Sequence, residues 1–221
     1  MTTPEVRPGL THERVGVFAD AIFAIAITLL ALELPRPEGE DRMRLPAFLG
    51  EHVSSFVAFG IAFGMLWVAW RAHHRLFDQV ARLSQAVITL HLPLLFLVAC
   101  LPYVTSLFGD VNRLPDEAAG GGRATAIALF AGTEALLMLC QGTMIGLVLR
   151  QGLYREGSDL SRLRTEGRVD WGIGAFWALT AVAAAWMADV VPLLWMATPV
   201  VAYGVARVSR LRNRRLAAQA G

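Results

Sequence analysis

The sequence predicts an all-α membrane protein with six transmembrane helices in a single domain, residues 1–221. Three observations support this fold class. The chain is 55% hydrophobic and only 17% charged, its mean hydropathy is +0.49, and six apolar runs reach the roughly 20 residues that span a bilayer. Too little polar sequence remains for a separate soluble domain. The predicted helices cover residues 15–34, 47–71, 84–108, 123–150, 168–188 and 190–208.

The first run, 15–34, contains an acidic residue, Asp20, and a hydroxyl, Thr28. The run is longer than the apolar part of a signal peptide, and "LALELPRPEGE" is a poor cleavage site, so we interpret it as a retained helix. An ionisable residue in a membrane helix costs roughly 2.5–3.5 kcal/mol on insertion scales and marks a functional site by default. We therefore expect Asp20 to have a polar partner and treat it as a candidate functional residue.

Helical periodicity gives this first helix two faces. At about 100° per residue, Ile25, Thr28, Leu29 and Leu32 form one stripe, and Asp20 points roughly 140° away from Ile25. Spacing alone leaves two interpretations open: the stripe faces lipid, or it forms a functional surface.

The end of the second run offers partners for Asp20. Arg14 lies six residues from Asp20, which is the wrong separation for an ion pair on one helix face. His73, His74 and Arg75 in "WVAWRAHHRLF" fit better. The adjacent histidines do not predict a metal site, because they point in different directions and no Cys, Asp or Glu completes a ligand set at a usual spacing.

Two glycine motifs and one short connection give further information about how the helices pack. Gly60 and Gly64, and likewise Gly142 and Gly146, form G-x-x-x-G motifs that let helices approach closely in lipid, either within one chain or between copies. Only "ADVVP" separates the fifth and sixth runs, which predicts a tight turn around residues 189–192.

The arginines predict the orientation, and they are the only basic residue type in the chain. Fifteen lie on the side of the N-terminus and five on the other, which predicts that both termini are cytoplasmic. The first set is Arg7, Arg14, Arg71, Arg75, Arg82, Arg150, Arg155, Arg162, Arg164, Arg168, Arg207, Arg210, Arg212, Arg214 and Arg215; the second is Arg36, Arg42, Arg44, Arg113 and Arg123. The basic tail "RVSRLRNRR" is then a determinant of topology and lipid-headgroup contact rather than a nucleic-acid-binding arm.

Three stretches of the chain resemble a known family. Arg14-x-x-x-Phe18-Ala19-Asp20, followed by "AIFAIAITLLALELP", is similar to the R-x-x-x-F-S-D signature of the transmembrane protein 175 potassium channels, which include single-unit bacterial homologues. "WVAWRAHHRLF" and "HLPLLFLVACLPYVTSLFG" also agree, so the resemblance is strongest over 14–109. The chain departs from the family pattern twice: Ala19 replaces a serine, and His91 stands where asparagine is expected.

The resemblance implies a potassium-permeable cation channel in the cell membrane. Four copies would surround a central pore lined by the first helix, with K⁺ as the permeant ion, no cofactor, and membrane lipids and other copies of the chain as partners. The chain lacks the T-V-G-Y-G carbonyl filter. The implied constriction is Ile25, Leu29 and Leu32, with Thr28 for selectivity. The implied polar network is Arg14, Phe18 and Asp20 with His73 and His74.

Other functions are less well supported by the sequence. A proton- or cation-coupled secondary transporter is the main alternative, with Glu134 and His91 as its candidate residues, although no inverted repeat is found. A non-conducting scaffold is a further possibility. No Ser-His-Asp arrangement, H-E-x-x-H motif or phosphate-binding glycine loop points to an enzyme.

Overall fold

The computed structural model describes residues 12–112, 114 and 121–220, and these residues are almost entirely helical. Six helical segments are long and apolar enough to cross a membrane, which confirms the predicted fold class. Five of them are single helices, and the sixth is a segment over Val191–Asn213 that ends in α9. The single helices are α1 (His12–Leu32), α3 (Val53–Gln79), α4 (Gln85–Asn112), α6 (Gly122–Arg150) and α7 (Leu160–Met187); α9 covers Thr198–Ala220.

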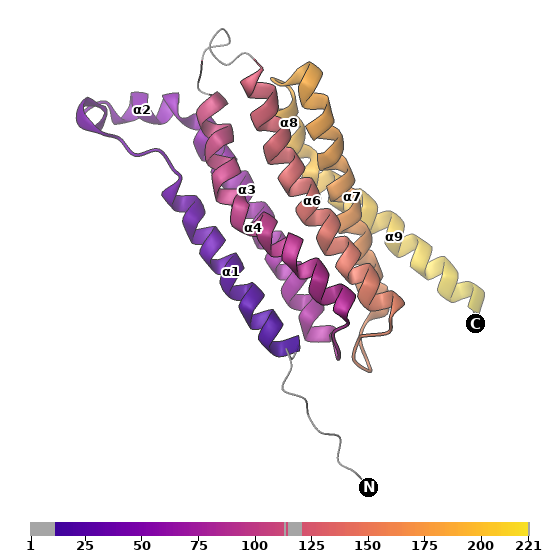
Figure 1. Cartoon of the computed structure of the whole chain (residues 1–221). Coiled ribbons are helices and arrows are strands. Elements are labelled where there is room, and N and C mark those ends of the chain that lie inside the picture. Colours follow the sequence, from indigo (N-terminus) through magenta and orange to yellow (C-terminus); the bar gives the residue numbers. More distant parts are fainter. Residues whose placement is uncertain (1–11, 113, 115–120, 221) are drawn as a thin grey trace.

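The helices pack as two connected groups. α1, α3 and α4 contact one another, α7 packs against both α6 and α9, and the contact between α4 and α6 joins the groups. In Figure 1, α1 and α9 lie at opposite sides of the bundle, and α1 begins at the same end at which α9 ends. We call this the arginine-rich end, because the larger predicted arginine set belongs to it. Arg7 and Arg113 lie outside the described residues.

Three helices extend furthest beyond their predicted apolar runs. α3 continues to Gln79 rather than 71, α7 begins at Leu160 rather than 168, and α9 continues to Ala220 rather than 208. Hydropathy locates only the part that crosses hydrocarbon, whereas arginine, glutamate and glutamine are good helix formers in polar surroundings. The start of α7 is also capped, since the Asp159 side chain accepts a hydrogen bond from the Arg162 backbone N–H at 2.9 Å.

Short helices take up the first residues of two predicted runs, 47–71 and 190–208, so both predicted starts were wrong. η1 (Gly39–Arg42) and α2 (Leu45–Glu51) lie between α1 and α3. The predicted sixth run, 190–208, is not a single helix: it starts with the short helix α8 (Val191–Leu194) and η2 (Trp195–Ala197), and α9 begins only at Thr198. Two tryptophans fix this short segment: Trp195 Nε1 donates to Thr180 Oγ1 at 3.1 Å, and Trp177 Nε1 donates to Thr198 Oγ1 at 3.2 Å.

The two helix groups are also tied together at the arginine-rich end. The residues after α3 pair with those after α6 through an antiparallel bridge between Val80 and Tyr154. The Arg155 backbone N–H donates to the Gln79 carbonyl at 2.8 Å. Gly152 has a φ of +62°, which the turn after α6 requires and which side chains with a Cβ rarely adopt.

The two G-x-x-x-G motifs behave differently. A Cβ at Gly142 would lie 2.7 Å from Trp171 Cδ1 and 3.0 Å from the Gly167 carbonyl oxygen, so this glycine permits the close approach of α6 and α7. Gly60 and Gly64 are exposed, and a Cβ at either would meet nothing within 4 Å. Within the described residues, Gly142 therefore serves helix packing, whereas a Cβ at its motif partner Gly146 would also meet nothing within 4 Å.

Candidate functional site

The α1 helix has a buried face and an exposed face. Phe23, at 0% exposure, and Leu30, at 1%, pack into the core shared with α3 and α4. The predicted stripe lies on the other side: Ile25 is 58% exposed, Leu29 40% and Leu32 60%. A single chain thus leaves an apolar stripe of a membrane-length helix largely exposed.

Thr28 is the one hydroxyl on this exposed stripe. Its Oγ1 donates to the Ile25 carbonyl at 2.8 Å, within the same helix. A threonine hydroxyl has one proton and two acceptor lone pairs. Because the backbone takes the proton, the oxygen can only accept on its outer side, which suits contact with a cation.

An apolar hollow of about 440 Å³ lies between the exposed faces of α1 and α4. Phe18 lines it together with Ile25 on α1 and Phe96 on α4. The structure therefore places Phe18, which is 61% exposed, in an apolar hollow rather than beside Asp20. The reason is geometric, since two residues of separation turn the side chains by about 200° around the helix.

Asp20 is held by two residues of α3. Its Oδ1 accepts a hydrogen bond from Trp70 Nε1 at 2.9 Å, and its Oδ2 lies 3.2 Å from His74 Nδ1. The Trp70 and His74 rings stack with centroids 5.5 Å apart. Sequence reasoning included His74 among the candidates and missed Trp70. The i, i+4 spacing of the two residues, which places them on one helix face, was the available signal.

His73 serves another contact. It is fully buried, and its Nε2 lies 3.2 Å from Nε2 of His91 on α4. His91 Nδ1 lies 2.7 Å from the Val87 carbonyl. Because a carbonyl only accepts, His91 donates through Nδ1, and its Nε2 is then the acceptor for the His73 N–H when both rings are neutral. The histidine at 91 thus links α3 to α4.

The other predicted residues lie apart from this pair of contacts. Arg75 faces away from α1 and pairs with Glu166 of α7 at 3.3 Å. Arg14 is exposed near the start of α1. Ala19 is 0% exposed in the core, so a close-packed methyl stands where the family has a serine. Glu134 is also 0% exposed, and its carboxyl oxygens have no hydrogen-bond partner among the described residues.

The fold and these contacts define the class of protein: a helical, multi-pass membrane protein whose first helix is anchored by a carboxylate on one face and presents an apolar stripe on the other. Comparisons with known proteins show which family the chain resembles. The model of the endosomal/lysosomal potassium channel TMEM175 family matches residues 14–102.

Among relatives, the chain is 36% identical over 100 residues to a potassium channel of Streptomyces collinus; the match covers 45% of this chain and 48% of that one. It is 29% identical over 135 residues to a potassium channel of a Chryseobacterium species, covering 60% and 68%. The chain thus spans about half the length of the first relative.

Solved structures share the whole fold. The crystal structure of a TMEM175 homologue from Chamaesiphon minutus matches with a TM-score of 0.59 and 24% identity, covering 84% of this chain and 96% of that one. The potassium channel MtTMEM175 matches with a TM-score of 0.60 and 15% identity, covering 96% and 99%. The resemblance to the TMEM175 family predicted from the sequence is therefore confirmed, and residues 14–102 carry it.

Proposed function

We propose that the chain forms a potassium-permeable cation channel in the cell membrane, with four copies around a central pore lined by α1. The family match and the relatives named as potassium channels support this activity. Both termini are cytoplasmic in this proposal, since α1 begins and α9 ends at the arginine-rich end. Neither the comparisons nor the contacts of the described residues favour the transporter alternative.

The exposed stripe of α1 is the observation that carries the proposal. One α1 helix cannot enclose a pore, so a pore along it requires several copies around an axis, and closed symmetric assemblies are the usual form. The anchor of Asp20 to Trp70 and His74 lies on α3, so it fixes α1 from the side away from Ile25. The same anchor therefore orients the stripe toward the axis.

The gate is a ring of Ile25 side chains. Ile25 is near the middle of its span, and it offers no polar atom to an ion. An ion at such a ring loses hydration without replacement, and hydrophobic constrictions gate by dewetting. Leu29 and Leu32 form further apolar layers, and Thr28 supplies an acceptor oxygen between the Ile25 and Leu29 layers.

The experiment is a liposome flux assay of Ile25→Asn at matched protein incorporation. We expect higher resting K⁺ flux and weaker discrimination among cations, because the amide wets the ring. Val182→Asn on α7 is the matched control, since Val182 is 61% exposed and Ile25 58%. It should leave flux unchanged. An assembled Ile25→Asn protein with wild-type flux would place the gate elsewhere.

A further inference from the structure

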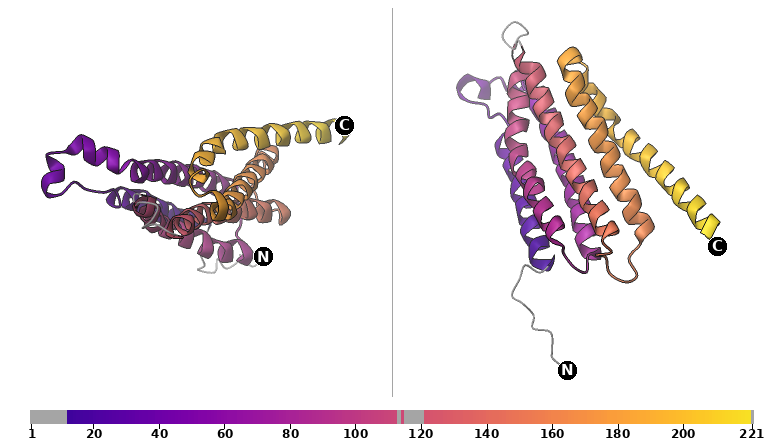
Figure 2. Two further views of the ribbon diagram at one scale, coloured as in Figure 1. Left: turned by 90° about the horizontal axis from the view of Figure 1, so that it is seen from above. Right: turned by 45° about the vertical axis from the view of Figure 1, so that its right-hand side comes forward.

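A second cavity, of about 480 Å³, lies between α3, α7 and α9 at the arginine-rich end. It is far from the stripe on α1, since α9 and α1 lie at opposite sides of the bundle (Figure 1). Figure 2 shows α9 leaning away from α7 toward the C-terminal end. Part of the cavity wall is apolar, with side chains from all three helices: Val68, Ala72, Val169 and Ala206.

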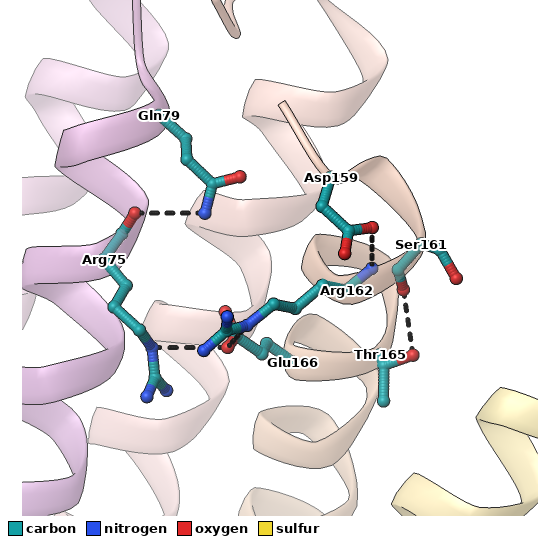
Figure 3. A network of polar contacts seen from close by, with 7 residues as sticks. All are labelled: Arg75, Gln79, Asp159, Ser161, Arg162, Thr165 and Glu166. Atoms are coloured by element: carbon teal, nitrogen blue, oxygen red, sulfur yellow. Dashed lines mark hydrogen bonds and ion pairs between the residues drawn. The ribbon is translucent and has the colours of Figure 1, made fainter. Parts of the chain in front are cut away.

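Two arginines meet at one carboxylate in this cavity. Arg75 Nε lies 3.3 Å and Arg162 Nε 3.2 Å from the same oxygen, Oε1 of Glu166. Figure 3 shows the two guanidinium groups reaching this carboxylate from different helices, with the terminal nitrogens of Arg75 turned away from it. Arg162 donates a hydrogen bond through Nε, whereas Arg75 makes an ion pair whose Nε meets no hydrogen-bond criterion, so Glu166 helps to fix the positions of both guanidinium groups.

A third arginine completes the cluster. Arg210 of α9 also lines the cavity, and its Nε donates to the Ala206 carbonyl at 3.2 Å. Within the described ranges, no hydrogen bond or ion pair involves the terminal guanidinium nitrogens of Arg75, Arg162 or Arg210. Three arginines from three helices therefore line one cavity.

The acidic residues of the cavity are engaged mainly with the scaffold. The Asp159 side chain caps the start of α7, and Glu166 holds the two arginines. Asp170 lies one turn deeper on α7 and is only 4% exposed. The accessible polar lining includes the Arg162 side chain, which is 57% exposed, and the exposed capping residue Asp159.

We propose that this cavity binds the phosphate of an anionic phospholipid, with the headgroup between Arg75, Arg162 and Arg210. Guanidinium groups bind phosphate oxygens through paired N–H donors, and basic pockets between transmembrane helices bind anionic headgroups. The apolar wall accommodates the start of an acyl chain, which distinguishes a lipid from free phosphate. The site is separate from the proposed pore and does not depend on it.

The test is a lipid titration of the delipidated full-length protein, followed by native mass spectrometry. Phosphatidylglycerol and phosphatidylcholine with identical acyl chains are compared, and water-soluble glycerol phosphate is the third probe. We expect tight binding of phosphatidylglycerol only. Arg210→Gln keeps both ion pairs of Glu166, so its fold should be intact, and it should lower the affinity about fivefold. Arg162→Gln with Arg210→Gln should lower it roughly 25-fold.

Arg212→Gln is the matched control, because Arg212 is exposed on the same helix but about 200° from Arg210. It should bind like the wild type, and so should Asp170→Asn, since no carboxylate charge is needed. The proposal is overturned by equal affinity for phosphatidylcholine, by unchanged affinity in the double variant, or by an equal loss in the control. Glycerol phosphate binding as tightly as phosphatidylglycerol would overturn the assignment to a lipid.

Discussion

The contact between Asp20 and Trp70 should contribute measurable coupling between α1 and α3. The perturbation is a double-mutant cycle of Asp20→Ala and Trp70→Phe, in which the phenylalanine keeps the ring but removes the N–H donor. The hydrogen bond is 2.9 Å long and charge-assisted. It joins α1 to α3 through two residues that are 50 positions apart in the sequence. Together with the His74 contact, it ties Asp20 of α1 to α3.

The expected magnitude follows from the exposure of the pair. Hydrogen bonds to charged groups contribute about 1.5–3 kcal/mol in proteins, but the Asp20 side chain is 33% exposed, which reduces the effect. Coupling energies between transmembrane helices average about 0.6 kcal/mol and reach about 1.7. We therefore expect about 1–1.7 kcal/mol of coupling, with the His74 contact remaining in the Trp70→Phe variant.

The assay is equilibrium unfolding in mixed detergent micelles for the wild type, both single variants and the double variant. Trp186→Phe is the control, because Trp186 is 79% exposed on α7, and it should show no coupling to Asp20. Coupling below about 0.3 kcal/mol, the level of independent sites, would refute the view that this bond anchors α1. Equal coupling to the control would refute it as well.

Three further predictions concern packing, a buried pair and selectivity. Gly142→Ala should lower thermal stability and Gly60→Ala should not, because only the first added methyl meets another helix. His91→Leu should lower the unfolding free energy by about 1–3 kcal/mol in a detergent melt by leaving His73 without its acceptor, and adding His73→Leu should restore most of it. Thr28→Val should shift the bi-ionic reversal potential toward equal K⁺ and Na⁺ permeability, whereas Thr28→Ser should not; equal effects would exclude a role for the hydroxyl.

Sequence reasoning located the spans better than their ends. The six apolar runs match six membrane-length helical segments of the described chain, since the membrane fixes the hydrophobic length. The predicted end of α3, start of α7 and end of α9 were wrong, because hydropathy does not detect a helix that continues through polar residues. His74 was correctly included among the partners of Asp20, but spacing could not separate it from His73 or reveal Trp70.

The sequence by itself determined the helical membrane fold, the family resemblance over the first half of the chain and the stripe on the first helix, because each depends on composition or local periodicity. Only the tertiary structure decided which polar groups meet. Helix rotation and register bring Trp70 to Asp20, His91 to His73, and three arginines to one cavity. These contacts join residues far apart in the chain, and a rotation of one residue, about 100°, would break them.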